Sequence, residues 1–317
     1  MDVSICIVNW NTRDLLYQCI RSIKEKTTGV RYEIIVVDNN SQDGSTKMLK
    51  EQFPDCRVIE SKVNLGFVKG NNRAVQEASG KYILYLNPDT ELVTNAIYGM
   101  FKILESEKEI AAIGCRLVNP DGTTQFTCAR TFPTPLKQFS ELSMLNRVFK
   151  NSKMLGTAEM EYWNHQTSRE VDCLTGACIM ARKDLIDRLN GFDENLFMYA
   201  DDVELCYRIK KMGWKIYYLA TEAILHKEGA STSQRKEKFF STILQRESNC
   251  YFLKKHFGRL KAWQFKLAVF GGAIIRILLI ILALLPSRFM MKSDRISIHT
   301  INKYLNLLLW SVGITHA

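Results

Sequence analysis

Hydrophobic residues in the first half of the chain form short continuous runs, and each run is followed by a segment with helical spacing. Continuous runs of this kind are typical of strands that are buried on both faces of a parallel sheet. The predicted strands span 3–11, 32–41, 57–61 and 81–87, and the predicted helices between them span 12–26, 42–53 and 70–80. Strands that alternate with single helices predict βαβ units and a mostly parallel sheet with right-handed crossovers.

The pattern is less regular between about residues 115 and 172. Residues 136–155 predict an amphipathic helix or a flexible flap, and the segments around them are typical of turns and loops. Inserts that bind an acceptor are often built in this way, although no function can be deduced directly from this one. Regular elements return with a strand at 173–181, a short helix, a helix at 201–212 and a strand from Trp214.

The C-terminal region contains a long apolar run from Leu267 to Pro286, in which Arg276 is the only charge. Its length is close to the roughly 20 residues that span a bilayer. A central arginine would cost a spanning helix about 2.5–3.5 kcal/mol, whereas a helix that lies in the interface lets the side chain reach water. Residues 288–292 and 304–310 resemble further interfacial segments. The alternative is a buried helix of a soluble dimer, and we favour monotopic membrane attachment.

Charge and cysteine content extend this picture. Residues 231–317 hold 14 Lys and Arg but 3 Asp and Glu, so this tail is strongly basic while residues 1–230 are nearly neutral. A basic tail binds polyanions, and its apolar content favours an anionic membrane surface over nucleic acid. The nine cysteines are scattered without a Cys-x-x-Cys pair, and no signal peptide precedes Val3. We therefore expect free thiols and a location on the cytoplasmic face of the cell membrane.

Two common nucleotide sites are excluded by their missing motifs. A dinucleotide site would require Gly-x-Gly-x-x-Gly after the first strand, where this chain has "NWNTRD", and a Walker-type phosphate loop is also missing. The predicted strands instead end in polar residues. These residues are Asn9, Asn11, Asp38 to Ser41, Asn64, Asn87 and Asp89. Each alone is ordinary for a cap or a turn, but four neighbouring clusters predict a ligand site at the carboxyl edge of the sheet.

Two of these strand ends offer specific chemistry. Asp38 can accept hydrogen bonds from a pyrimidine N–H or a ribose hydroxyl, because Ser41 or Asp43 can cap the following helix in its place. Asp89 can bind a divalent cation on a nucleoside diphosphate, which needs hard oxygen ligands. Asn87 brings a neutral amide that can bind metal weakly or contact sugar or phosphate. Pro88 fixes the turn between them.

The later motifs add an acid cluster and a histidine. Asp201, Asp202 and Glu204 lie at a helix start, where the dipole favours acids, yet two adjacent acids exceed what a cap requires. Asp202 is a candidate general base, Asp201 can bind an acceptor hydroxyl, and Glu204 is spaced to pair with Arg208. A lone His226 after a strand is usually structural, but it can complete a metal site begun by Asp89.

Six ordered motifs between residues 3 and 231 resemble those of the glycosyltransferase family 2 enzymes with the GT-A fold, and in particular the rhamnosyltransferases. The motifs are "VNWN", "IIVVDNNSQDGS", "NLGFVKGNNRAV", "YILYLNPDTEL", the stretch from "LTGACIMAR" to "YRIKKMGWK", and "ILHKEGAS". The resemblance implies an α/β, Rossmann-like domain over residues 1–230 with a mostly parallel central sheet. Residues 231–317 would then form a basic, apolar, helical region that associates with the membrane.

The resemblance also implies roles for individual residues. Asn87 and Asp89 stand at the family's Asp-x-Asp metal motif, Asp202 at its catalytic base, and His226 at a position that often completes the metal site. The candidate substrate-binding residues, from the strand ends and this resemblance, are Asn9, Asn11, Asp38, Asn40, Asn64, Gly66, Asn71, Asn87 and Arg208. This chain has Asp201 where the family's motif has Glu, so the choice of base between Asp201 and Asp202 stays open.

The function implied is an inverting sugar transfer that depends on Mg²⁺ or Mn²⁺. On resemblance the donor is a nucleotide-sugar such as dTDP-rhamnose, and the acceptor is a lipid-linked saccharide of a surface polysaccharide; a homodimer is possible. Two alternatives come from other classes. A catalytically decayed binding or scaffold protein would explain Asn87, and a sugar nucleotidyltransferase would require a Gly-rich, basic phosphate loop that "NWNTRD" does not provide.

Overall fold

The computed structural model describes residues 1–227, 240–284 and 294–315, and its contacts divide the chain into two units. The first unit holds Met1–Phe132 and Asn164–Lys236, and the second holds Pro133–Trp163 and Glu237–Ala317. The division predicted at residue 230 assigned residues 133–163 to the first domain. In the structure this segment groups with the C-terminal helices, because one of its helices packs against the long apolar helix.

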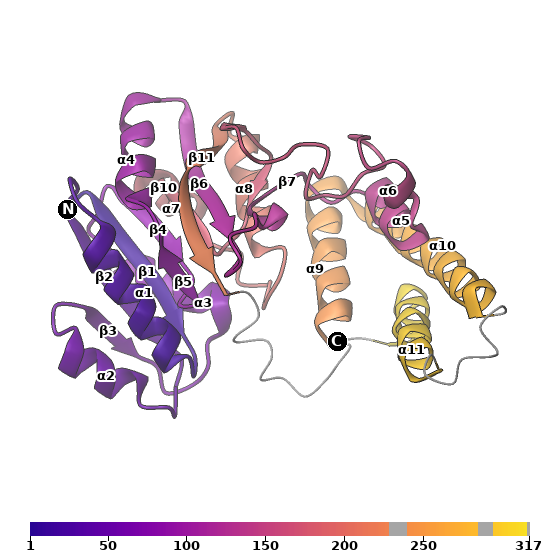
Figure 1. Ribbon diagram of the computed structural model, residues 1–317, viewed down its shortest axis with the longest axis horizontal. Coiled ribbons are helices and arrows are strands. Elements are labelled where there is room, and N and C mark those ends of the chain that lie inside the picture. The colour runs from indigo at the N-terminus through magenta and orange to yellow at the C-terminus, as the bar shows by residue number, and fades with distance from the viewer. Residues whose placement is uncertain (228–239, 285–293, 316–317) are drawn as a thin grey trace. The chain divides into compact units, whose positions relative to one another are not determined.

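A nine-stranded sheet forms the centre of the first unit (Figure 1). Its strands are β1 (Val3–Asn9), β2 (Tyr32–Asp38), β3 (Arg57–Glu60), β4 (Tyr82–Leu86), β5 (Thr90–Leu92), β6 (Ile110–Val118), β8 (Arg169–Glu170), β10 (Cys178–Arg182) and β11 (Lys215–His226). They follow the order β3-β2-β1-β4-β10-β6-β11-β5, and β8 pairs with β11. The four predicted strands of the first half are confirmed.

Most of the long pairings in this sheet are parallel, as predicted. β1 pairs in parallel with β2 and β4, β2 with β3, and β6 with β11. β10 runs antiparallel between β4 and β6, and β5 and β8 run antiparallel to β11. The single strand predicted at 173–181 is two strands, since a turn at Thr175 separates β10 from β9 (Cys173–Leu174). β9 pairs with β7 (Ala129–Arg130) in a second small sheet.

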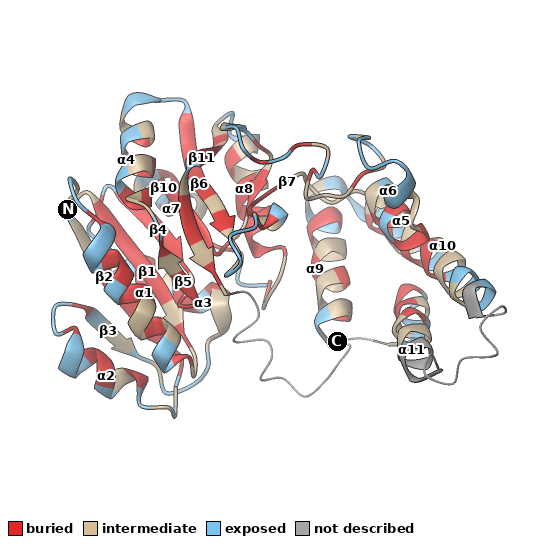
Figure 2. Ribbon diagram, in the orientation of Figure 1, coloured by how far each residue is buried: buried red, intermediate tan, exposed pale blue. Residues whose placement is uncertain are grey.

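Helices flank the strands of the first unit. They are α1 (Arg13–Lys26), α2 (Ser45–Gln52), α3 (Gly66–Gln76), α4 (Ala96–Ser106), α7 (Lys183–Leu189) and α8 (Asp201–Lys211), with a 3-10 turn at η1 (Phe126–Cys128). Figure 2 shows the central strands buried and the outer faces of the helices exposed. α3 packs closely on β1, because a Cβ at Gly70 would approach a methyl group of Val8 to 2.8 Å. The helix can approach this strand only with glycine at that position.

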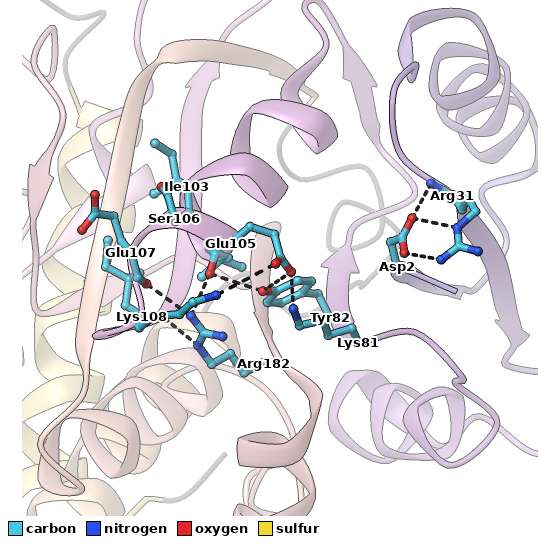
Figure 3. Close-up of polar contacts among 12 residues, drawn as sticks. Asp2, Arg31, Lys81, Tyr82, Ile103, Glu105, Ser106, Glu107, Lys108 and Arg182 are labelled. Carbon is cyan, nitrogen blue, oxygen red and sulfur yellow. Dashed lines mark hydrogen bonds and ion pairs between the residues drawn. The ribbon is translucent and has the colours of Figure 1, made fainter.

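Ion pairs and hydrogen bonds tie the elements together at the amino edge of the sheet (Figure 3). Glu105, at the end of α4, accepts from the hydroxyl of Tyr82 at 2.7 Å and pairs with Lys81. Arg182, the last residue of the antiparallel β10, donates to the main-chain oxygens of Leu104 and Ile110 at 2.7 and 2.9 Å. These contacts hold the edge of the sheet opposite the carboxyl ends of the parallel strands. The loops at those carboxyl ends are not engaged in these contacts, and they hold the candidate site residues.

The second unit is helical in the described residues. Its helices are α5 (Pro135–Ser143), α6 (Leu145–Val148), α9 (Phe240–Phe257), α10 (Arg259–Leu284) and α11 (Asp294–Ser311). α5 and α10 pack closely, since a Cβ at Gly272 would lie 2.6 Å from the Cβ of Leu142. The single helix predicted for residues 136–155 is found in part: α5 and α6 are two shorter helices, and the helical segment ends at Val148.

α10 contains the apolar run that the sequence singles out. Arg259–Leu282 is long and apolar enough to cross a membrane by length and composition, with a mean hydropathy of 2.3 and 22% of the window buried. Arg276 is engaged within the unit: it donates to the main-chain oxygens of Leu142 and Glu141 at 2.6 and 2.7 Å and lies over the ring of Tyr304. Residues 304–310 are helical in α11, whereas 288–292 lie outside the described residues.

Candidate active site

The carboxyl ends of β1 and β2 lie side by side and hold the first group of predicted residues. Asn9 and Asp38 are register partners, and Asn9 Nδ2 donates to Asp38 Oδ1 at 2.8 Å. Asp38 Oδ2 accepts from the main-chain N–H of Ser41 at 2.9 Å. Both side chains are buried, so their orientation is fixed before any ligand binds. Each carboxylate oxygen has two lone pairs, which leaves Asp38 with capacity for a further donor.

Asn11 and Asn40 shape the two loops beyond these strands. Both have left-handed backbones, with φ of 51° and 61°, a conformation that asparagine tolerates better than most residues. Asn11 Oδ1 accepts from the N–H of Gln42 at 2.7 Å, which links one loop to the other. Asn40 is exposed, and its Oδ1 accepts from the Gln42 side chain at 3.2 Å. The structure therefore brings all four residues of these two strand ends together.

The loop before α3 is joined to the end of β2. Gly66 has a φ of 75°, its N–H donates to Asn64 Oδ1 at 2.9 Å, and its main-chain oxygen accepts from Asn39 Nδ2 at 3.1 Å. Asn39 belongs to the polar run predicted after β2, but the sequence did not single it out as a substrate-binding residue. Asn71 is buried in α3 and donates to the main-chain oxygen of Phe67 at 3.0 Å. In this structure Asn71 supports the helix, and its contact with a substrate stays a prediction.

Backbone pairing brings Asp89 and His226 together. β4 ends at Leu86, the chain turns through Pro88, and β5 then pairs with β11 so that Thr90 lies opposite His226. As a result His226 Nε2 lies 3.5 Å from Asp89 Oδ1. Both side chains are buried, and Asp89 Oδ1 has no hydrogen-bond partner in the described part of the chain.

This geometry fits a divalent cation. Two ligand atoms about 2.0–2.2 Å from one ion, at tetrahedral to octahedral angles, are separated by roughly 3–3.5 Å. A buried carboxylate oxygen without a partner is costly, and a cation between the two side chains would satisfy it. Within residues 1–227, 240–284 and 294–315 no group of three or more His, Cys, Asp or Glu is arranged to hold a metal ion. The pair therefore suits an ion that takes its remaining ligands from phosphate and water.

Asn87 lies half-exposed at the same turn. Its main-chain N–H donates to Ala177 O at 3.1 Å, and its main-chain oxygen accepts from Thr90 Oγ1 at 2.7 Å. No hydrogen bond of its side-chain amide is found among the described residues, so the backbone alone holds Asn87 in place. Its side-chain amide is available to bind a metal or to contact the sugar or phosphate of a substrate.

The acid pair at the start of α8 is buried. Asp202 Oδ2 accepts from Arg130 at 2.5 Å and from the main-chain N–H of Gly176 at 3.0 Å. Burial, and then the neighbouring charge of Asp202, raise the pKa of Asp201 to about 7. Arg130 was missed by the sequence analysis, because it reaches Asp202 through the pairing of β7 with β9, two strands too short to leave a pattern.

Glu204 and Arg208 form the ion pair that their spacing predicts, at 2.7 Å. Arg208 also donates to the main-chain oxygens of Leu189 and Gly191, at 2.6 and 2.7 Å. Glu204 is fully buried, so the pair joins α8 to the end of α7. With three donors engaged in this way Arg208 has a structural role here, and its contact with a substrate stays a prediction.

Comparison with known proteins identifies the family. The family described as "Glycosyl transferase family 2" matches residues 4–189, more than half of the chain and the part that holds β1, β2, β4 and the Asn-Pro-Asp turn. The chain belongs to glycosyl transferase family 2. It is therefore a glycosyltransferase, and the family predicted from the motifs is confirmed.

Several relatives of this glycosyltransferase have assigned names. It is 26% identical over 212 residues to an N-acetylglucosaminyl-diphospho-decaprenol L-rhamnosyltransferase of Mycobacterium tuberculosis. This match covers 63% of the chain and 68% of the relative. It is 25% identical over 231 residues to the rhamnosyltransferase WbbL of Escherichia coli. That match covers 71% of the chain and 83% of the relative. These matches confirm the predicted similarity to the rhamnosyltransferase subgroup.

A third relative is much longer. The glycosyltransferase is 28% identical over 236 residues to the O-antigen biosynthesis protein RfbC of Myxococcus xanthus, and this match covers 72% of the chain but 17% of that protein. The chain thus spans less than a fifth of that relative's length.

Solved structures confirm the fold class. A mannosyltransferase from Pyrobaculum calidifontis, in complex with GDP-Man and Mn²⁺, matches with a TM-score of 0.59 at 15% identity, over 98% of this chain and 86% of that one. GalNAc-T7, with UDP, GalNAc and Mn²⁺, also matches with a TM-score of 0.59 at 13% identity. The match covers 98% of this chain and 57% of that one. The α/β GT-A fold predicted from the sequence is confirmed.

Proposed function

We propose that this glycosyltransferase is an inverting, metal-dependent enzyme that transfers rhamnose from dTDP-rhamnose to a lipid-linked saccharide in the synthesis of a cell-surface polysaccharide. The sugar and the acceptor class rest on the two rhamnosyltransferase relatives, one of which is named for an acceptor carrying diphospho-decaprenol. The metal dependence rests on the buried Asp89 Oδ1 that faces His226 Nε2 at 3.5 Å. This contact is the single structural observation that carries the proposed metal-dependent transfer.

The proposed donor site is the carboxyl edge of the parallel strands. Asn9, Asn11, Asp38 and Asn40 would hold the base and ribose of the nucleotide, and the loop with Asn64 and Gly66 would border the sugar. Asp89 and His226 would hold Mg²⁺ or Mn²⁺. When bound, such an ion offsets the charge that develops on the nucleoside diphosphate leaving group.

Asp202 is the proposed base. A general base must be held within reach of the proton that it accepts, and Arg130 and the N–H of Gly176 fix the carboxylate of Asp202 in place. Asp201 has a raised pKa, so it holds a proton more readily than an exposed carboxyl group does. The acceptor oxygen forms a bond to the anomeric carbon as the bond to the diphosphate oxygen breaks, and the hydroxyl proton passes to Asp202. Attack opposite the leaving group inverts the anomeric configuration.

The lipid acceptor agrees with the surface of α10. Its exposed apolar residues recur every three or four positions, which places them along one side of the helix. These residues are Leu260, Trp263, Leu267, Phe270, Ile274 and Leu278. The hydrogen bonds of Arg276 to main-chain oxygens of α5 favour an interfacial position over a spanning one, because a spanning α10 would carry the polar end of α5 into the bilayer. We propose that α10 lies on the cytoplasmic face of the membrane.

The proposal is tested with purified protein, Mn²⁺, dTDP-rhamnose and a polyprenyl diphosphate saccharide. We expect release of dTDP and a rhamnosylated lipid whose new linkage is inverted, as read by NMR. Asp202→Asn should lower the rate about 10²–10⁴-fold, the usual contribution of a general base. Asp184→Asn, an exposed acid on α7, is the matched control and should leave the rate unchanged.

Three results would contradict the proposal. Full activity of Asp202→Asn would remove Asp202 as the base. Formation of dTTP and rhamnose 1-phosphate from dTDP-rhamnose and added pyrophosphate would indicate a sugar nucleotidyltransferase. Binding of dTDP-rhamnose without turnover of any lipid-linked acceptor would indicate a binding protein.

A further inference from the structure

Gln125 lies directly behind His226, in the segment that follows β6. Its N–H donates to Leu117 O at 2.9 Å, after a short hairpin closed by the bridge between Val118 and Thr124. The side chain is buried, with 6% of the residue exposed. It contacts the last residue of β11 at two points: Nε2 donates to the main-chain oxygen of His226, and Oε1 faces His226 Nδ1, both at 2.8 Å.

The orientation of this amide is determined by its partners. A main-chain oxygen can only accept, so the atom of Gln125 that faces His226 O must be the nitrogen. Its second hydrogen goes to Asn119 Oδ1 at 2.7 Å. The remaining atom, Oε1, is an acceptor, and Nδ1 of His226 must therefore carry the ring hydrogen.

A chain of hydrogen bonds fixes the same orientation from its other end. The carboxylate of Asp121 can only accept, and the hydroxyl of Thr123 donates to it at 2.6 Å. The Thr123 oxygen then accepts from Asn119 Nδ2 at 2.8 Å, which turns Asn119 Oδ1 toward Gln125. Donor and acceptor roles thus alternate from Asp121 through Asn119 and Gln125 to His226.

The hydrogen on Nδ1 determines the state of the other ring nitrogen of His226, Nε2. With the hydrogen on Nδ1, the Nε2 atom of the neutral ring has a bare lone pair, and it faces the carboxylate oxygen of Asp89 at 3.5 Å. Two acceptors at this distance repel each other unless a cation lies between them. We infer that Gln125 is the positioning residue that holds His226 in the Nδ1–H form, with Nε2 directed at the divalent cation bound with Asp89.

The inference rests on the proposed function in one respect, that His226 binds metal. Outer partners of ligating histidines set the ring orientation and the tautomer, and their loss typically lowers metal affinity 10–100-fold. Gln125 lies in the turn "LVNPDGTTQ", which the sequence marks only as a turn. Nothing in its spacing relates it to His226, 101 residues away.

The test uses the full chain and two measurements other than activity. Long-range ¹H–¹⁵N NMR of the metal-free protein, with His226→Ala to assign the signal, should show the ring hydrogen on Nδ1. Gln125→Leu should give a mixture of tautomers. Mn²⁺ binding in the presence of dTDP, followed by electron paramagnetic resonance, should weaken 10–100-fold in Gln125→Leu. Gln125→Glu keeps the acceptor that faces Nδ1 and should keep the ring hydrogen there, although it replaces the Nε2 that donates to His226 O and Asn119 Oδ1 with an oxygen.

A matched control separates positioning from folding. Gln138 of α5 is also 6% exposed, and Gln138→Leu should change neither the tautomer of His226 nor the affinity for Mn²⁺. A hydrogen on Nε2 in the wild type would overturn the inference. So would tight Mn²⁺ binding by the wild type that is unchanged in Gln125→Leu. If the wild type does not bind Mn²⁺, or if His226→Ala binds it equally well, the proposed metal site itself is wrong.

Discussion

Asp201 is buried beside the charge of Asp202, and its pKa is raised from 3.8 to about 7. Between these two pH values the folded protein holds a proton that the unfolded chain has released. The free energy of unfolding contributed by this group is therefore highest below pH 4, falls as the pH rises towards 7, and is constant above that. Burial of Asp201 beside Asp202 thus lowers the free energy of unfolding at neutral pH relative to pH 4.

Asp201→Asn should remove this pH dependence. We expect the free energy of unfolding of the variant, relative to that of the wild type, to rise by a few kcal/mol from pH 4 to pH 7. One pKa unit corresponds to about 1.4 kcal/mol. Denaturant unfolding of the metal-free protein across this range measures the difference. Asp184→Asn, an exposed acid, should follow the wild type at every pH. A difference between Asp201→Asn and the wild type that does not change with pH would contradict the raised pKa.

The resemblance to the family places Asn87 at the first acid of the Asp-x-Asp metal motif. Its side chain is half-exposed at the turn that ends in Asp89. Asn87→Asp should strengthen Mn²⁺ binding in the presence of dTDP by about tenfold, equivalent to about 1.4 kcal/mol, because a second carboxylate would face the same cation. Asp89→Asn should weaken it by at least about 100-fold. Unchanged affinity in Asn87→Asp would indicate that this side chain faces the donor and not the metal.

At the scale of elements, the site depends on how strands pair. Asp89 and His226 meet because β5 runs antiparallel to β11 with Thr90 opposite His226. The pairing is supported by the ion pair of Lys227 with Glu91 at 2.5 Å and by the N–H of Lys227, which donates to Asp89 O at 2.9 Å. A shift of one residue in this register would turn either side chain to the other face of the sheet.

Arg182 has a corresponding role at the amino edge of the sheet (Figure 3). It ties β10 to the end of α4 and the start of β6 by donating to the main-chain oxygens of Leu104, Glu107 and Ile110. Arg182→Ala should lower the free energy of unfolding by about 2–3 kcal/mol, with Mn²⁺ affinity unchanged. Arg188→Ala, an exposed arginine of α7, should change stability by less than about 0.5 kcal/mol. Equal effects of the two changes, measured by denaturant unfolding, would contradict this role.

At the scale of the whole molecule, the chain combines a nearly neutral catalytic unit with a basic tail. The second unit carries the exposed apolar side chains of α10, which are the proposed contact with lipid, and residues 231–317 hold the excess of positive over negative charge. Both contributions should add to membrane binding, and salt distinguishes them. Apolar contact is independent of salt, whereas attraction to anionic lipid is screened by it.

The triple change Trp263→Ser, Leu267→Ser and Phe270→Ser should weaken binding of the full chain to anionic vesicles by about 30-fold or more. Binding of the wild type should also decrease from low to high salt. Vesicle flotation measures both effects. Val63→Ser with Val93→Ser, which removes exposed apolar residues of the first unit, should have no effect. Equal flotation of the triple variant and the wild type would contradict membrane contact through α10.

Much of the fold could be predicted from local patterns. The continuous apolar runs of β1, β2 and β4 identify buried strands, and the polar residues just beyond them identify the ligand edge, because neighbouring residues alone set these features. The basic, apolar tail is likewise a property of composition. The sequence by itself thus determined the fold class, the family and the candidates Asp89, Asp202 and His226.

The partners of these residues were decided only by the tertiary structure. Arg130 reaches Asp202, and Gln125 reaches His226, through pairings that join segments about 70 to 100 residues apart. Strands of two or three residues, such as β5, β7 and β9, are too short to show a period. Residues 133–163 likewise group with the C-terminal helices because α5 packs against two glycines of α10. Such contacts follow from packing and strand register across the folded chain, which no local window of the sequence contains.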